Sequence, residues 1–179
     1  EVEALLPILL ESAERLLRRE PATQFILAQA STIQDNLVHD LLRRSAVPVT
    51  VVKEQASEVI AASDLVLVAS GTATLQAAVV GTPMVLLYRT TAFTYWLARL
   101  LIRVKWIGLV NLVADRTVIP ELIQADATAQ QVYEQARRIL EDPGVYDEMT
   151  RGLARVKAQL GEPGASTRAA EVVLGACRA

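Results

Sequence analysis

The 179-residue chain has very few of the residues that hold metals and disulfides. It contains one cysteine, Cys177, and one histidine, His39, which we expect at the surface. These single residues exclude an internal disulfide, a cysteine-based zinc site and a multi-histidine metal site within the chain. We therefore expect neither a metal nor a cofactor, and the scarcity of cysteine is typical of a reducing cytoplasm.

Aromatic residues and an excess of positive charge are also lacking. Lysine and arginine total 18 against 20 acidic residues, which argues against a nucleic-acid binder that must neutralise phosphates. No basic region followed by an apolar segment stands at the start, so we expect no signal peptide, and a first residue Glu1 in place of methionine indicates a fragment. Hydrophobic residues make up 52%, which excludes a disordered chain and suffices for a single domain over residues 1–179.

The longest run without charge covers 24 residues, Leu65–Tyr88, and is long enough to cross a membrane. Polar residues and Pro83 interrupt it, and its two ends, 65–69 and 84–87, are short apolar runs of the kind that form strands buried on both faces. The segment between them is rich in alanine and valine and favours a helix. We predict two buried strands joined by a helix, not a membrane span.

Predicted strands and helices alternate over most of the chain, which indicates βαβ units. Apolar spacing predicts helices at 1–19, 32–44, 57–62, 91/92–104, 128–141, 143–160 and 166–177, with Thr128 and Ser166 as N-caps. Short apolar runs predict strands at 25–28, 49–52, 65–69, 84–87 and 106–109. We expect a turn or short helix at 121–124 and no strand in the last 60 residues. The fold class is therefore α/β, with a Rossmann-like parallel sheet, flanking helices and a helical tail over 128–179.

This order of elements lacks an opening strand. A doubly wound sheet has the strand order 3-2-1-4-5-6, in which the first strand is central. If the strand at 25–28 is the second and the strand at 65–69 is the fourth, the first is missing before Glu1. Its two neighbours would carry unpaired backbone groups in the core. Either the chain is cut short, the sheet rearranges, or a neighbouring chain fills the gap.

A loop rich in hydroxyl side chains follows the strand at 65–69. A helix start offers free N–H groups and a positive dipole end to anions, and ligands of open α/β sheets lie beyond the carboxyl ends of strands. Gly71 allows a phosphate to approach the backbone closely, and Ser70, Thr72 and Thr74 add donors. The pattern predicts a phosphate site, although an ordinary strand-to-helix loop with an N-cap explains the same residues.

Residues 63–89, SDLVLVASGTATLQAAVVGTPMVLLYR, resemble the donor-nucleotide region of the lipid-A-disaccharide synthases, a family of GT-B glycosyltransferases. The similarity continues in FTYWLA, NL and PELIQ within residues 93–128 and in GEPGAS at 161–166. It implies the carboxy-terminal, donor-binding half of an enzyme whose donor is UDP-2,3-diacylglucosamine and whose acceptor is 2,3-diacylglucosamine 1-phosphate. It also implies an inverting transfer that forms the β-1,6 bond of lipid A without a required metal.

The resemblance also implies roles for individual residues. The implied contacts with the UDP donor are Gln55, Ser70, Gly71, Thr72, Thr74 and Gln76. Gln55 matches a glutamine beside the base, and Gln76 stands where the family usually has a glutamate that accepts hydrogen bonds from the ribose. A neutral amide accepts more weakly than a carboxylate, so Gln76 is a departure that affects donor affinity. Further candidate contacts with sugar or phosphate are Arg89, Asn111 and Glu121.

Two parts of the family pattern are not found in the sequence. One is a Gly-Ser-Arg loop after the first strand, and the other is the amino-terminal half with the acceptor site and the proposed base. An inverting transfer needs a base to activate the acceptor hydroxyl. We assign that role to no residue here, since Asp35, Asp40 and Asp64 are expected as surface or cap residues, so the chain alone should be inactive.

Five of the eight aromatic residues fall between Tyr88 and Trp106, where every charge is positive. An apolar helix with nearby basic residues is typical of the surface of an anionic membrane. A core helix with arginines that extend to water, or a protein interface, explains the same pattern. The predicted membrane or acyl contacts are Phe93, Trp96, Leu97, Arg99, Leu100, Arg103 and Trp106. We accordingly expect a cytoplasmic protein held peripherally at the inner membrane.

Two other functions fit the sequence. Another GT-B relative that uses UDP-GlcNAc, such as a muramyl-type GlcNAc transferase or a UDP-GlcNAc 2-epimerase, shares the UDP-binding fold. A catalytically inactive fragment or interaction module, whose sheet edges pair with another chain, is favoured by Gln76 and by the absent strand. The expected partners are the lipid substrates, the membrane surface, the missing amino-terminal half and a second copy in a homodimer, with no nucleic acid.

Overall fold

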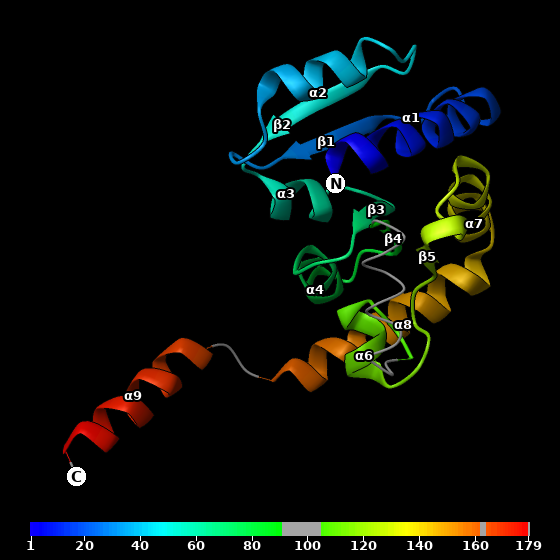
Figure 1. Cartoon of the computed structure of the whole chain (residues 1–179). Helices are drawn as coiled ribbons and strands as arrows, with labels where there is room; N and C mark the ends of the chain where they lie inside the picture. Colours follow the sequence, from blue (N-terminus) through cyan, green and yellow to red (C-terminus); the bar gives the residue numbers. More distant parts are fainter. Residues whose placement is uncertain (91–104, 162–163, 179) are drawn as a thin grey trace.

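The computed structural model describes residues 1–90, 105–161 and 164–178. Figure 1 shows helices and strands that alternate along the chain as far as β5, followed by helices. The helices are α1 (Val2–Arg19), α2 (Asp35–Leu42), α3 (Ala56–Ala61), α4 (Ala73–Val80), α6 (Leu109–Ala114), the 3₁₀ turn η1 (Gln124–Asp126), α7 (Ala129–Glu141), α8 (Pro143–Leu160) and α9 (Ala165–Arg178). The strands are β1 (Phe25–Gln29), β2 (Val49–Lys53), β3 (Val66–Ala69), β4 (Met84–Tyr88) and β5 (Glu121–Ile123). The helix predicted at 91/92–104 lies outside the described residues.

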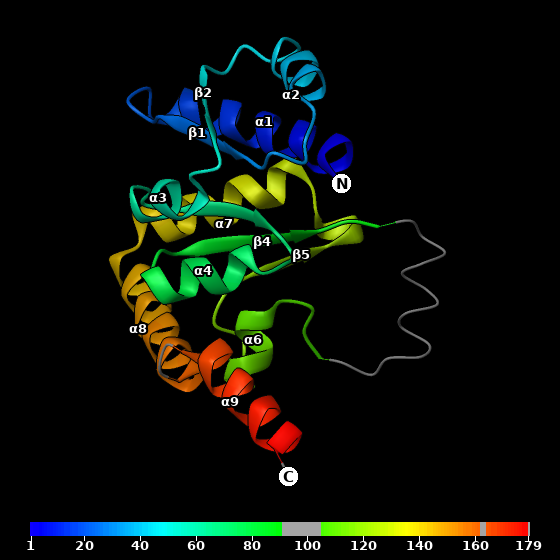
Figure 2. The same cartoon turned by 90° about the vertical axis from the view of Figure 1, so that its left-hand side faces the viewer.

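The strands are parallel and form two sheets. β1 pairs with β2, and β4 lies between β3 and β5. Figure 2 shows β1 and β2 with α1 and α2 above the three-stranded sheet. Within the described ranges, β1 and β3 each have one neighbouring strand. Strand pairing is therefore interrupted between β1 and β3, where the sequence predicts a missing strand. The pair β2-β1 matches strands 3-2 of a doubly wound fold, and the order β3-β4-β5 matches strands 4-5-6. This confirms the Rossmann-like α/β class.

The three-stranded sheet supports the main hydrophobic core. β4 is fully buried from Met84 to Leu87, since helices cover both faces of a central parallel strand. Val132 of α7 and Leu153 of α8 are buried in the same cluster. The predicted helical tail is thus packed into the core as far as α8, whereas α9 extends away from it (Figure 1).

Helix α1 contributes to two hydrophobic clusters at once. Leu5 belongs to the main core, whereas Leu6 and Leu10 pack with Leu41 of α2 in a smaller cluster over β1 and β2. Successive helical residues point about 100° apart, so neighbouring leucines reach different partners. Because α1 contacts both α2 and α7, it connects the two sheets.

Two predictions from residue patterns are confirmed in full. The charge-free run forms β3, α4 and β4, and within the described residues no helix has the length and apolar character needed to cross a membrane. Thr128 is the N-cap of α7, where its side chain accepts a hydrogen bond from the amide of Gln131.

The predictions for residues 106–109 and 121–124 are wrong. Residues 106–108 form no strand, because the carboxylate of Glu121 accepts hydrogen bonds from the amides of Ile107 and Gly108, which a strand would need for pairing. Glu121–Ile123 forms the edge strand β5 beside β4, contrary to the prediction that no strand lies beyond residue 120. Three residues are too few to show the alternation that identifies a strand.

Two predicted helix starts also differ from the structure. The helix predicted from Thr32 begins at Asp35, because the chain first makes a turn in which the amide of Ile33 donates to the carbonyl of Ala30. The last helix begins at Ala165, so Ser166 lies in its first turn and is not the N-cap. Helix ends often differ by one or two residues between pattern and structure.

Candidate functional site

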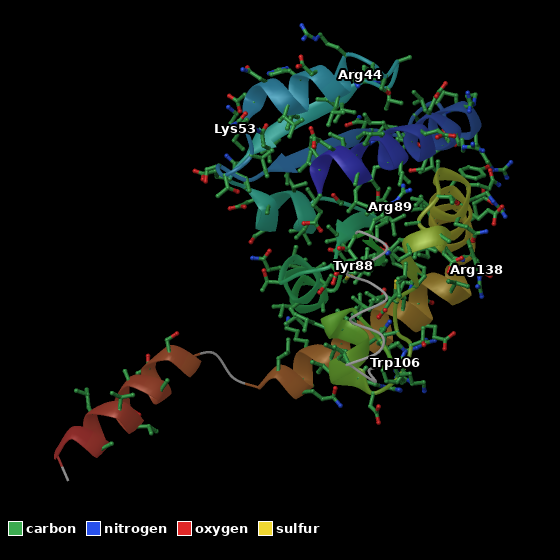
Figure 3. The ribbon with its side chains drawn as sticks, viewed as in Figure 1. Arg44, Lys53, Tyr88, Arg89, Trp106 and Arg138 are labelled. Carbon is green, nitrogen blue, oxygen red and sulfur yellow. The ribbon has the colours of Figure 1, made fainter. Side chains whose placement is uncertain are left out.

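The carboxyl ends of β3, β4 and β5 meet at one edge of the three-stranded sheet, because these strands are parallel. Ser70 follows β3, Arg89 follows β4 and Gln124 follows β5. Figure 3 shows Arg89 close to Tyr88 at the end of β4, and Arg89 is exposed. The fold therefore brings the predicted phosphate loop and one predicted sugar or phosphate contact to the same edge.

The loop at residues 70–72 leads from β3 into α4 and is open at the surface. A Cβ atom added to Gly71 would meet no atom within 4 Å. Thr72 is the exposed N-cap of α4, and its side chain makes no capping hydrogen bond. The described residues provide no backbone acceptor for the amides of Gly71 and Thr72. Together these features leave free donors at the start of a helix, where an anion is favoured.

The Ser70 backbone amide and the Thr74 side chain make hydrogen bonds within the protein. The amide of Ser70 donates to the carbonyl of Leu87 at 3.0 Å and extends the pairing of β3 with β4. Thr74 is fully buried, and its Oγ1 donates to the carbonyl of Gly71 at 2.7 Å. Thr74 thereby holds the shape of the loop at residues 70–72 from its buried side. Its direct contact with phosphate stays a prediction, one that requires its hydroxyl to leave Gly71.

A hollow of about 400 Å³ lies beside this loop, between α3 and α4. Its lining residues are Ser57, Thr72, Leu75, Gln76, Val79 and Val80. Gln76 is exposed, and Gln55 is the exposed N-cap residue of α3 without a side-chain capping bond. Gln76 thus lines the hollow itself, whereas Gln55 lies at the start of α3, the helix that contributes Ser57 to the lining.

Asn111 and Glu121 form a hydrogen-bonded network inside the protein. Asn111 is fully buried; its Oδ1 accepts from the amides of Val118 (2.7 Å) and Ile119 (3.0 Å), and its Nδ2 donates to the carbonyl of Ile119 (2.9 Å). The same Nδ2 donates to Glu121 Oε1 at 2.8 Å. The Glu121 carboxylate also accepts the amides of Ile107 (2.9 Å) and Gly108 (3.0 Å). Both side chains therefore fix the backbone around α6, and their contacts with sugar or phosphate stay predictions.

Gln124 was not identified from the sequence as a site residue. Its Oε1 accepts from the amide of Thr90 at 2.8 Å, and its Nε2 donates to the carbonyl of Thr90 at 3.1 Å. Its backbone is left-handed, with φ of 52°, which is uncommon for a residue other than glycine. The side-chain amide thus holds the chain just after Arg89. The one sequence signal that could have identified Gln124 is its place as the last residue of the PELIQ motif.

Of the predicted membrane contacts, Trp106 alone lies in the described residues. Its side chain is 9% exposed and donates from Nε1 to Thr117 Oγ1 at 3.1 Å, and Lys105 Nζ lies 4.3 Å from the centre of the ring. The indole is therefore part of the packed protein here, and its acyl contact stays a prediction. The other predicted contacts lie outside the described residues; they are Phe93, Trp96, Leu97, Arg99, Leu100 and Arg103.

Comparison with known proteins identifies a family. The family model described as lipid-A-disaccharide synthetase matches residues 1–173. The chain belongs to the lipid-A-disaccharide synthetase family. Named relatives include the lipid-A-disaccharide synthases of Geobacter sulfurreducens and Myxococcus xanthus, which are 42% and 41% identical to it over 97% of the chain. The synthase of Nitrosococcus oceani is 37% identical over the same share.

The chain spans 45% of the length of each of these three family members. The family model nevertheless covers nearly all of the chain, including the loop at residues 70–72, the α3–α4 hollow and the Asn111–Glu121 network. The family resemblance predicted from the motifs is confirmed. Among the described residues, no group of three or more histidine, cysteine or acidic side chains is arranged to hold a metal ion.

Proposed function

We propose that the chain is the donor-binding half of a lipid-A-disaccharide synthase and holds the nucleotide of UDP-2,3-diacylglucosamine. The observation that carries the proposal is the open loop at Gly71 and Thr72, with free amides at the start of α4. A diphosphate is a suitable ligand because it is anionic and accepts hydrogen bonds from such amides. The hollow beside the loop, with Gln76 and Gln55 on its two helices, provides room for the ribose and base.

In the proposed reaction, the bond between the sugar C1 and the diphosphate breaks while C1 bonds to the 6-hydroxyl oxygen of 2,3-diacylglucosamine 1-phosphate. The configuration at C1 inverts, the hydroxyl proton passes to a base, and UDP leaves. Negative charge grows on the diphosphate as the bond breaks. Fixed donors at the start of α4 are suited to stabilise that charge, and because the helix already holds them in place, they need little rearrangement.

The remaining parts of the enzyme are proposed to come from residues that this chain does not include. A parallel strand between β1 and β3 would complete the 3-2-1-4-5-6 order, since each of these strands has one described neighbour. The acceptor site and the catalytic base are assigned to the amino-terminal half, so the chain by itself is expected to bind donor without transferring sugar. An apolar strand and a Gly-Ser-Arg turn encoded just before Glu1 would support this assignment.

Peripheral attachment to the cytoplasmic face of the inner membrane is also part of the proposal. Both proposed substrates carry acyl chains, so the enzyme must act at a lipid surface. The segment between Arg89 and Lys105 supplies only positive charges, and anionic lipids attract such segments. A homodimer remains a proposal that rests on the family.

The phosphate site is tested with a matched pair of substitutions at Gly71. Asparagine and aspartate have nearly the same shape, and the open space around Gly71 accepts either. Gly71→Asp places a negative charge where the diphosphate is proposed to bind, so UDP affinity measured by calorimetry should fall at least about tenfold relative to Gly71→Asn. Equal affinities in the two variants would contradict the site, and no heat with the unmodified chain would contradict the function.

A further inference from the structure

A cluster of polar side chains connects the ends of β1 and β2 to the start of α2. Gln29, the last residue of β1, is 7% exposed. Its Nε2 donates to the carbonyl of Ile33 and to Asp35 Oδ1, both at 2.9 Å. Asp35 Oδ2 accepts from Lys53 Nζ, on the last residue of β2, at 2.6 Å. One carboxylate therefore joins two neighbouring strand ends through a buried amide and an ammonium group.

The chain turns sharply just after this cluster. Glu54 has φ of 55°, in the left-handed region that favours glycine. Its amide donates to the backbone carbonyl of Gln29 at 3.0 Å. Such a conformation is strained and persists where the surrounding contacts determine it. Here the contacts are the Gln29 carbonyl on one side and the fixed end of β2, held by Lys53, on the other.

The turn leads directly into the α3 side of the candidate site. Gln55 follows Glu54 as the N-cap residue of α3, and Ser57 lines the hollow together with Thr72 and Gln76. Figure 3 shows Lys53 at this end of β2. The Glu54 turn therefore connects the polar cluster at the ends of β1 and β2 to Gln55 and Ser57 at the start of α3.

We propose that Asp35 is a positioning residue for the base end of the bound nucleotide. It touches no ligand; it holds Lys53 and Gln29 so that the Glu54 turn presents Gln55 to the base. This inference rests on the proposed function. Asp35 and Lys53 are 53% and 59% exposed, and exposed ion pairs contribute little to folding, so loss of this pair should leave the thermal midpoint unchanged. The Lys53 ammonium also lowers the pKa of Asp35, which keeps the carboxylate charged.

The test compares Asp35→Asn with Asp40→Asn in the full chain. Asp40 lies on the same helix and pairs with the exposed Arg43, so both variants lose one exposed carboxylate. UDP and pyrophosphate are titrated separately by calorimetry, and the thermal midpoint is measured for each variant. We expect Asp35→Asn to weaken UDP binding about fivefold, equivalent to about 1 kcal/mol, with pyrophosphate affinity and thermal midpoint unchanged. Asp40→Asn should change none of the three.

A second substitution checks that the carboxylate acts through Lys53. Lys53→Met should weaken UDP binding as Asp35→Asn does, and the double variant should be no weaker than either single variant, because both remove the same interaction. Two results would overturn the inference: UDP affinity of Asp35→Asn equal to that of Asp40→Asn, or an equal loss of UDP and pyrophosphate affinity. Absence of UDP binding to the unmodified chain would instead refute the proposed function.

Discussion

Removal of the Asn111 side chain should destabilise the protein more than any exposed substitution. Asn111 makes four hydrogen bonds with the backbone of Val118 and Ile119 and with Glu121. Asn111→Ala leaves the amide and carbonyl of Ile119 without these partners, and Ile119 is fully buried. Each buried polar group left unsatisfied costs about 1–3 kcal/mol, so we expect a loss of about 3–4 kcal/mol.

Such a loss is a large share of the roughly 5–15 kcal/mol that stabilises a domain. In urea, with a slope of about 2 kcal/mol per molar, the unfolding midpoint should fall by about 1.5–2 M. Far-UV circular dichroism reports helix loss. Tryptophan fluorescence reports the surroundings of Trp96 and Trp106, and the Trp106 indole bonds to Thr117. The two signals should shift together.

The matched control is Asn36→Ala, which removes the same side chain from an exposed position in the first turn of α2. Surface substitutions of this kind usually change stability by less than about 0.5 kcal/mol. If the urea midpoints of the two variants coincide, the network around Asn111 contributes no net stability and the reasoning is refuted.

Two further predictions concern ligands. Gln76→Glu should tighten UDP binding about three- to tenfold, because a carboxylate accepts hydrogen bonds from ribose hydroxyls more strongly than an amide does. The control Gln131→Glu adds the same charge on α7 and should leave UDP affinity unchanged. An equal change of UDP affinity in both variants would contradict the proposed contact of Gln76 with the ribose. Vesicles with anionic lipid should sediment the chain in a salt-sensitive manner, and Arg99→Glu with Arg103→Glu should abolish this while Arg43→Glu with Arg44→Glu does not. If the variant with Arg99→Glu and Arg103→Glu sedimented as the unmodified chain does, the proposed membrane contact would be contradicted.

The charge-free segment shows which features the sequence predicts well. β3, α4 and β4 are recognisable because a central parallel strand is buried on both faces and therefore reads as a continuous apolar run. β5 escaped prediction because it has three residues and a charged first residue. Glu121 itself explains the error at 106–109: a residue far along the chain binds the amides that local pattern assigns to a strand.

Some parts of the candidate site could likewise be predicted from the sequence, and others could not. The open loop at Gly71 and Thr72 was predictable because a link between a buried strand and a helix has a local pattern, and its contact with phosphate stays a prediction. The Gln124–Thr90 contact and the Gln29–Asp35–Lys53 cluster are not, since their partners lie 34, 6 and 18 residues apart and meet only through the sheet. Thr74 is an intermediate case, because its position was predicted but its hydroxyl braces the loop.

The division of α1 between two leucine clusters limits how this helix can evolve. A single inserted or deleted residue would rotate the rest of the helix by about 100°. Leu5 and Leu6 would then face the wrong neighbours on both sides at once. Length variation among relatives should therefore accumulate outside α1, whereas changes within it should be paired substitutions that preserve side-chain volume.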